Sequence, residues 1–376
     1  MTLKRNFPAL CISTAVVLVG CEQSADQIPP VVERLSAPAT INPRSSIEIA
    51  AKDNVGVTGV RLFAKTSTGD LLIGESTSRS APYVISPRTQ KIPNLSNLEI
   101  YAEARDTAGL KANSETVKVQ VADDLAPALD YFAGFTYPQS AVMAQSLSGE
   151  LLTPEIQPEE VMPPAGWHSS QESAIALQAT ALEPSRAQAV EWGFRPVSGA
   201  LGYNVYSSDQ PITGYELVQG LRSVQGDPLI RHAKFLPKEA SEQQFGVITV
   251  LGSGGESAFS QASQARFLPT QELATPIDGQ DVIGGRPTLT WSLNPSDNVS
   301  GYLFFVYKQN PEQVRSVPVW SSREGQSTSA TNAVYPSDRP ALSAGIYYWR
   351  VAAVSFNSRG TADGFSYSPV RTFVVK

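Results

Sequence analysis

Cysteine and histidine are the scarcest reactive side chains in this sequence of 376 residues. Its two cysteines, Cys11 and Cys21, both lie near the beginning, so the chain beyond Cys21 has none. No disulfide can stabilise that part, and its fold must depend on the burial of apolar area. The two histidines, His168 and His232, lie in unlike sequence contexts. Neither belongs to a spaced set of His, Asp and Glu of the kind that holds zinc.

Basic residues are also outnumbered by acidic ones. The formal net charge is −6, and the lysines and arginines form no patch of the kind that gathers phosphate groups. We therefore expect no nucleic-acid partner.

Catalytic motifs are missing as well. The sequence has no phosphate-binding loop, nucleophile elbow or dinucleotide fingerprint, and the glycine-rich stretch at 252–255 lacks the strand–turn–helix context that such motifs need. No paired carboxylates occur in a recognisable motif, although a carboxylate with a raised pKa could still act as a general base. We therefore expect a protein that is not an enzyme, with no catalytic residue and no organic cofactor.

The first 20 residues predict an export signal. A basic start at Lys4 and Arg5 precedes an apolar stretch from Phe7 to Val19, and small residues follow. This stretch is too short for a membrane-spanning helix, which takes about 20 apolar residues.

The segment Leu18-Val19-Gly20-Cys21 resembles the lipobox of bacterial lipoproteins. The resemblance implies that residues 1–20 are removed and that Cys21 carries a diacylglyceryl group and an acylated amine, with palmitate among the acyl chains. Because each buried methylene contributes about 0.8 kcal/mol, three acyl chains would anchor the protein in a lipid membrane. Glu22, in place of an aspartate, favours the outer membrane in a Gram-negative cell. The alternative is an ordinary signal peptide with a chance cysteine.

Two stretches have the composition of connections between folded parts. Residues 21–30 are typical of a short flexible tether. Residues 125–172 are rich in proline and acidic residues and contain no lysine or arginine. Structureless stretches longer than about 12–15 residues are uncommon inside a domain, so we interpret 125–172 as an acidic, Pro-rich interdomain linker. Its aromatic cluster at 131–137 is too apolar to be solvated, and we expect it to pack on a neighbouring domain or, alternatively, to bind a ligand.

Residues 31–124 alternate apolar and polar side chains in short runs, which predicts strands with one buried face. The runs are Ile47–Ala50, Val60–Ala64, Leu71–Ile73, Leu98–Ala102 and Val117–Val121. The pattern of Ala51–Val60 followed by Ala102–Gly109 resembles the bacterial immunoglobulin-like domains of surface proteins. The resemblance implies an immunoglobulin-like β-sandwich over 31–124.

The last two regions, 173–268 and 269–376, repeat one pattern. Trp192 is followed ten residues later by Gly202-Tyr203, and Trp291 is followed ten residues later by Gly301-Tyr302. The offset of 99 residues marks an internal repeat, with both tryptophans expected in sandwich cores.

The repeated unit resembles the fibronectin type III sandwich, which takes about 100 residues. In the last copy, the resemblance implies a tyrosine corner at Tyr348, six residues after Leu342. The sequence therefore predicts an all-β protein of three tandem β-sandwich domains, one immunoglobulin-like and two fibronectin type III-like, joined by the Pro-rich linker.

Oxygen-bearing side chains occur in two loops of the first predicted sandwich. Asp53 would follow its second strand and Asp106 its sixth, which places both loops at one end. Asp53, Asn54 and Asp106 could supply some of the six to eight oxygen ligands that calcium takes, so calcium is a candidate cofactor. The alternatives are side-chain turns, or ion pairs with Arg61 or Arg105.

Aromatic residues near the end of the chain suggest a binding patch. Alternation places Tyr347 and Trp349 on the face opposite Tyr348, so both face outward if Tyr348 faces the core. Trp320 cannot be placed by alternation. Trp320, Tyr347 and Trp349 are candidates for a binding patch, and an exposed pair of Tyr347 and Trp349 could equally cover a contact between domains.

These features predict a non-catalytic, lipid-anchored protein of the cell envelope that serves binding, adhesion or scaffolding. Its sandwich edges and end loops would contact an envelope protein or a surface polysaccharide. One alternative is an accessory carbohydrate-binding or spacer subunit of a polysaccharide-processing system. Another is an unrecognised hydrolase with its site between domains.

Overall fold

The computed structural model describes residues 26–78, 80–123, 127–138, 161–163, 186–222, 229–236, 242–314, 316–322 and 327–376. Strands dominate these residues and no α-helix occurs among them, which confirms the predicted all-β fold class. The signal-peptide prediction for residues 1–20 and the lipidation prediction for Cys21 fall outside the described residues. Within the described part of the chain, no helix is long and apolar enough to cross a membrane.

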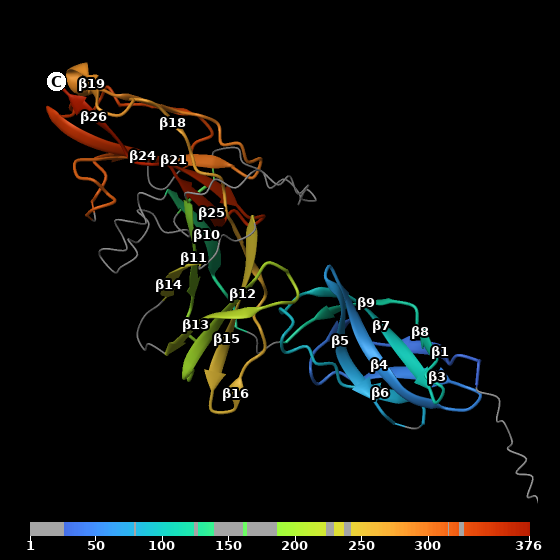
Figure 1. Cartoon of the computed structure of the whole chain (residues 1–376). Helices are drawn as coiled ribbons and strands as arrows, with labels where there is room; N and C mark the ends of the chain where they lie inside the picture. Colours follow the sequence, from blue (N-terminus) through green and yellow to red (C-terminus); the bar gives the residue numbers. More distant parts are fainter. Residues whose placement is uncertain are drawn as a thin grey trace, which may run out of the picture.

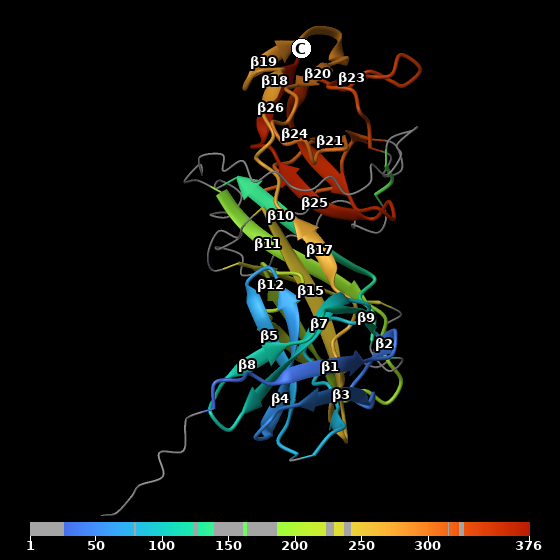
Figure 2. The same cartoon turned by 90° about the vertical axis from the view of Figure 1, so that its right-hand side faces the viewer.

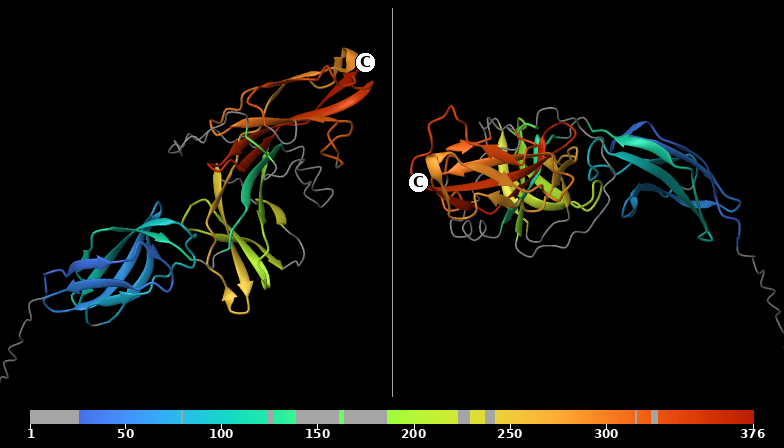
Figure 3. Two further views of the ribbon diagram at one scale, coloured as in Figure 1. Left: turned by 180° about the vertical axis from the view of Figure 1, so that it is seen from behind. Right: turned by 90° about the horizontal axis from the view of Figure 1, so that it is seen from above.

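The strands form three β-sandwich modules that follow one another along the chain (Figure 1). The first module holds β1 to β9, the second β10 to β17 and the third β18 to β26. They build an elongated body with the first and third modules at opposite ends (Figures 1 and 3).

The first module packs a sheet of order β1-β3-β6 against a sheet of order β2-β9-β7-β4-β5, with β8 beside β7. Alternation determines its core: Ile47 and Ile49 of β3 are buried, whereas Glu48 between them is exposed. Its strands are β1 (Val31–Ser36), β2 (Thr40–Ile41), β3 (Ile47–Lys52), β4 (Val57–Thr66), β5 (Gly69–Ser76), β6 (Tyr83–Ile85), β7 (Asn97–Asp106), β8 (Lys111–Asn113) and β9 (Val117–Val121).

The second module packs the strands β14-β11-β10 against a sheet of order β13-β12-β15-β16, with β17 beside β15. Trp192 of β11 lies in its core, as predicted. Its strands are β10 (Tyr131–Pro138), β11 (Arg186–Phe194), β12 (Gly202–Ser208), β13 (Glu216–Arg222), β14 (Ile230–Phe235), β15 (Gln243–Gly252), β16 (Gly255–Glu256) and β17 (Ser263–Arg266).

The third module repeats this arrangement. A sheet of order β18-β20-β23 packs on β21, β24 and β26, and Trp291 of β20 lies between them in the core. Its elements are β18 (Leu273–Thr275), β19 (Gln280–Val282), the short helix η2 (Ile283–Gly285), β20 (Thr288–Trp291), β21 (Gly301–Tyr307), β22 (Trp320–Ser321), β23 (Asn332–Val334), β24 (Gly345–Phe356), β25 (Ala362–Tyr367) and β26 (Arg371–Val375).

One sheet runs without a break from the second module into the third. Its order is β14-β11-β10-β25-β24-β21-β22, and the joint is the parallel pairing of β10 with β25 (Figure 2). Across this joint Phe135 stacks on Phe365 with ring centroids 4.8 Å apart, and Tyr137 stacks on Tyr367 at 5.5 Å. The two modules are therefore linked by backbone hydrogen bonds and by aromatic packing.

This joint corrects the interpretation of 125–172 as a linker. Residues 131–138 form a strand in the interior of the shared sheet, between β11 and β25. The expectation that the aromatic cluster packs on a neighbouring domain is confirmed, because Phe135 and Tyr137 contact β25 of the third module. Of the remaining linker residues, the structure describes 127–130 and 161–163, and Met162 accepts a backbone hydrogen bond from Ser327 of the third module.

The first and second modules meet through polar contacts. The Asn94 amide donates to the Ser260 carbonyl at 3.0 Å, and the Phe259 amide donates to the Gln90 carbonyl at 3.1 Å. Beside them, the Lys91 ammonium lies 3.0 Å from the Glu256 carboxylate. These contacts join the β6–β7 connection of the first module to β16 and the β16–β17 connection of the second.

Candidate metal centre

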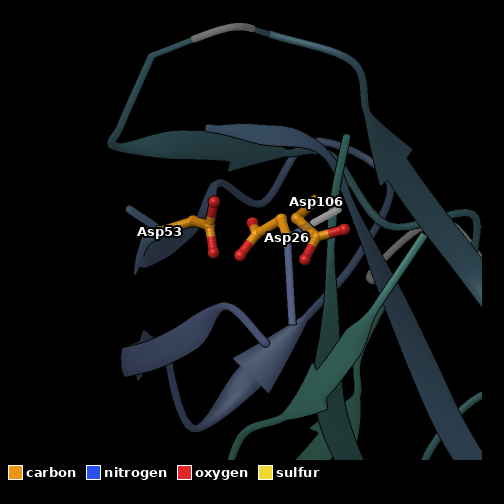
Figure 4. Close-up of side chains that lie close together, drawn as sticks. All are labelled: Asp26, Asp53 and Asp106. Atoms are coloured by element: carbon orange, nitrogen blue, oxygen red, sulfur yellow. The ribbon is translucent and has the colours of Figure 1, made fainter. Parts of the chain in front are cut away.

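Three aspartates from separate chain segments meet at the end of the first module that lies opposite its contact with the second. Asp26 precedes β1, Asp53 follows β3, and Asp106 ends β7. The register explains their meeting, because Val31 pairs with Lys52 and Val57 pairs with Asp106. Figure 4 shows the three side chains side by side, and one carboxylate oxygen of each lies within 4.8 Å of the others.

In each carboxylate, one oxygen is held by hydrogen bonds. Asp26 Oδ1 accepts from the Ile28 amide and from Asn54 Nδ2, both at 3.1 Å. Asp53 Oδ2 accepts from the amides of Val55 at 2.9 Å and Gly56 at 2.7 Å, which forms a side-chain turn. The φ of +148° at Gly56 is one that residues with a Cβ rarely adopt, so glycine suits this turn.

Asp106 is the most deeply buried member, with 2% of its surface exposed. Its Oδ1 accepts from the Leu110 amide at 2.8 Å. Its backbone is fixed too, because the Thr58 hydroxyl donates to the carbonyls of Arg105 and Asp106, both at 3.0 Å. The position of this carboxylate is therefore determined by the β4–β7 pairing and not by a mobile loop.

The second oxygen of each carboxylate lacks such hydrogen bonds. Asp26 Oδ2, Asp53 Oδ1 and Asp106 Oδ2 are all buried, and none has a hydrogen-bond partner among the described residues. Buried polar atoms in folded proteins nearly always have partners, and an unpaired buried charge is costly. The hydrogen bond from Gly56 lowers the pKa of Asp53, against a smaller opposing effect of desolvation. The cluster thus concentrates negative charge on oxygens that are free to hold a cation.

The donor set matches a hard cation. All of its ligand atoms are carboxylate oxygens, which suit calcium, whereas zinc sites are built mostly from histidine and cysteine. The structure brings Asp53 and Asp106 together as the sequence predicted. The side-chain amide nitrogen of Asn54 donates to Asp26, so Asn54 also orients one of the candidate ligands.

The sequence left two alternatives for these aspartates, a side-chain turn and an ion pair with arginine, and the structure shows the turn. The side-chain turn at Asp53 is present, but it uses Oδ2 and leaves Oδ1 unpaired. Among the described ion pairs, Arg61 lies 3.9 Å from Glu75, and neither Arg61 nor Arg105 pairs with Asp53 or Asp106.

Asp26 was not predicted as a calcium ligand, because its sequence context assigned it to the tether. A signal was available, because antiparallel pairing of the first strand with the one ending at Lys52 places residues before Val31 beside Asp53. Using it would have required knowing that these two strands pair.

The predicted aromatic patch is wrong. Trp320 is 5% exposed, Tyr347 1% and Trp349 0%, and all three belong to the core of the third module. The Tyr347 ring stacks on Phe373, and its hydroxyl donates to the Ser343 carbonyl at 3.0 Å. Tyr347 and Trp349 do share a face opposite Tyr348, but that face is the core. The implied tyrosine corner at Tyr348 is therefore wrong as well, because the hydroxyl that donates to upstream backbone belongs to Tyr347.

Comparisons with known proteins complete the description. The sequence matches no protein-family model and no curated protein. Among solved structures, the FN1–FN3 domains of chicken CNTN1 are similar at 13% identity and a TM-score of 0.31, covering 93% of this chain and 97% of that one. A Bacteroides ovatus mixed-linkage glucan utilization locus protein, SGBP-B, in complex with a mixed-linkage heptasaccharide, is similar at 11% identity and a TM-score of 0.29, covering 93% and 71%.

The fibronectin(III)-like modules of Clostridium thermocellum CbhA are similar at 11% identity and a TM-score of 0.18, covering 63% of this chain and 92% of that one. Structures of fibronectin type III modules are thus among those that resemble this chain. At such TM-scores the similarities carry no argument about what the chain binds.

Proposed function

We propose that this chain is a non-catalytic, lipid-anchored scaffold of the cell envelope, whose second and third modules present a binding surface to an envelope protein. The observation that carries the proposal is the sheet shared by these modules. Modules joined by flexible linkers move independently, whereas two modules that share a hydrogen-bonded sheet act as one stiff unit. Such a unit, at the end of the molecule far from β1, suits a protein that holds a partner away from a membrane (Figure 1).

A protein partner is favoured over a polysaccharide by where the tryptophans lie. Trp192, Trp291, Trp320 and Trp349, which are the tryptophans that the structure describes, are all buried. Flat aromatic side chains on the surface are what stacking on sugar rings would need. The exposed apolar side chains of the third module are aliphatic and include Leu293, Ile283 and Ile346, which suit contact with another protein.

The lipid anchor is tested by metabolic labelling. Cells grown with a palmitate analogue should incorporate it into the unsubstituted chain but not into the Cys21→Ser variant, which should leave the membrane fraction. Label on Cys21→Ser, or an unchanged membrane fraction, would refute the anchor.

The partner is tested by cross-linking in intact cells. A photoreactive amino acid at Leu293 or Ile346 of the third module should yield one defined protein adduct, whereas the same group at Val84 of the first module should not. Saturable co-sedimentation of the soluble chain with purified envelope polysaccharide, without a protein adduct, would instead support the accessory carbohydrate-binding function. Turnover of an envelope polymer by the purified chain would show a hydrolase.

A further inference from the structure

We propose that a calcium ion bound by Asp26, Asp53 and Asp106 fastens the N-terminal tether to the first module. With calcium bound, the tether would follow the module as one body; without it, the residues before β1 would pivot. The ion binding depends only on the folded chain. Its consequence at a membrane rests on the proposed lipid anchor at Cys21.

The geometry of the centre suits a cation. Asp106 is almost completely buried, yet its Oδ2 has no partner among the described residues, and its carboxylate lies beside those of Asp26 and Asp53 (Figure 4). The hydrogen bonds from Leu110, Gly56 and Asn54 hold each carboxylate in place through its other oxygen. A positively charged ligand would satisfy the three remaining oxygens together.

The ligand set favours calcium over magnesium. Calcium takes six to eight oxygens in flexible geometry, whereas magnesium demands near-ideal octahedral geometry and retains its waters. Three carboxylates on three separate segments suit the more tolerant ion, with water and carbonyl oxygens as further ligands. Sites of this kind in extracellular modules bind calcium with dissociation constants of about 10⁻⁴–10⁻³ M.

The three aspartates connect the tether to the sandwich. Asp53 and Asp106 belong to the sandwich, but Asp26 lies before its first strand, five residues after Cys21. Among the described residues, the Asp26 side chain is joined to the module by one exposed hydrogen bond from Asn54. A shared ion would replace this weak link with a chelate, so calcium would decide how firmly the membrane-proximal residues are attached.

Calcium binding is measured by titration calorimetry on Glu22–Lys376, which keeps every described residue. We expect one site in the unsubstituted chain and at least about tenfold weaker binding in Asp26→Asn, since even outer-shell partners of metal ligands cost about 10–100-fold when changed. Asp53→Asn and Asp106→Asn should behave alike, and Asp338→Asn, which removes an exposed charge in the third module, should bind as the unsubstituted chain does. Equal binding in all variants, or none in the unsubstituted chain, would overturn the proposal.

Fastening is measured separately by electron paramagnetic resonance. Glu22–Lys376 has no cysteine, so Ser24→Cys provides one position for a nitroxide, two residues before Asp26. Calcium should broaden the nitroxide spectrum, and it should not do so when Asp26→Asn is added. Calcium binding with an unchanged spectrum would overturn the fastening. Neither result depends on lipidation or on a partner, so failure here and failure of the proposed function are distinguishable.

Discussion

The buried carboxylate of Asp363 on β25 lies 3.4 Å from the partly buried guanidinium of Arg266 at the end of β17, and this ion pair links the third module to the second. Arg266 also donates to the Phe356 carbonyl at 3.3 Å, and the Ser355 hydroxyl donates to Asp363 at 2.7 Å. Desolvation raises the pKa of Asp363, and the charge of Arg266 opposes that rise.

Removing the arginine should weaken the joint between these modules. Arg266→Met leaves a buried carboxylate without its cation, and breaking a buried pair in this way costs about 3–5 kcal/mol. The variant's Asp363 pKa should rise further, and a raised folded-state pKa favours folding at lower pH, so the deficit should shrink as the pH falls. Urea unfolding at neutral and at acidic pH measures this. The double variant Arg266→Met/Asp363→Leu should recover much of the loss at neutral pH, and a deficit equal to that of Arg266→Met would contradict the account.

The same joint brings backbones close together at Gly134 of β10. A Cβ placed there would overlap the carbonyl of Arg266, so Gly134→Ala should destabilise the fold by about 1–3 kcal/mol through overpacking. Gly252→Ala is the matched control, because a Cβ at Gly252 meets nothing within 4 Å, and it should stay within about 0.5 kcal/mol of the unsubstituted chain. Equal unfolding free energies for the two variants would refute the close packing of β17 on β10.

Acid should weaken the second module around Glu256 and its contact with Lys91 of the first module. Desolvation acts to raise the pKa of Glu256, but hydrogen bonds outweigh it and lower the pKa from 4.5 to about 2; they come from Thr249, Tyr206, Asn204 and Lys91. A lowered folded-state pKa means that Glu256 stabilises the fold above pH 4.5 and that this contribution is lost as the pH falls toward about 2. Unfolding free energies should therefore fall more steeply in this range for the unsubstituted chain than for Glu256→Gln. Parallel curves would show that Glu256 contributes nothing.

Trp349 should behave as a core residue. Trp349→Ala should cost about 3–5 kcal/mol of unfolding free energy, whereas Tyr348→Ala, on the partly buried opposite face, should cost clearly less. Chemical denaturation of both variants measures the difference. Similar small losses would place Trp349 outside the core.

Local patterns predicted the modules well. Alternation located the strands around Ile47 and Ile100, and the 99-residue repeat placed Trp192 and Trp291 in equivalent cores. These predictions succeeded because each depends on neighbours in the sequence or on a spacing that both copies share.

The failures involve contacts between distant segments. The strand at 131–138 pairs with β11 beyond residue 185 and with β25 near the end of the chain. No local sequence pattern indicates such distant pairing partners. At Trp349 alternation was correct, but it cannot say which face is the core, and β24 is buried on both faces from Trp349 onward. Asp26 was missed for the same reason, because its meeting with Asp53 depends on strand register.

The most direct test of the account is the thermal stability of Glu22–Lys376 and of its Asp26→Asn variant, each in chelator and in calcium at about 100 times the dissociation constant. At that concentration a bound ion should stabilise the unsubstituted chain by about 2.7 kcal/mol. Because about 1 kcal/mol shifts the melting temperature of a domain of about 60–100 residues, the size of the first module, by about 4–8 °C, the change is easily measured. In chelator, Asp26→Asn should be at least as stable as the unsubstituted chain, because it removes one of three crowded negative charges. In calcium, Asp26→Asn should be less stable than the unsubstituted chain, because it binds the ion more weakly. A variant that is less stable in both conditions, with no effect of calcium on the unsubstituted chain, would show that the three aspartates only support the loops and hold no ion.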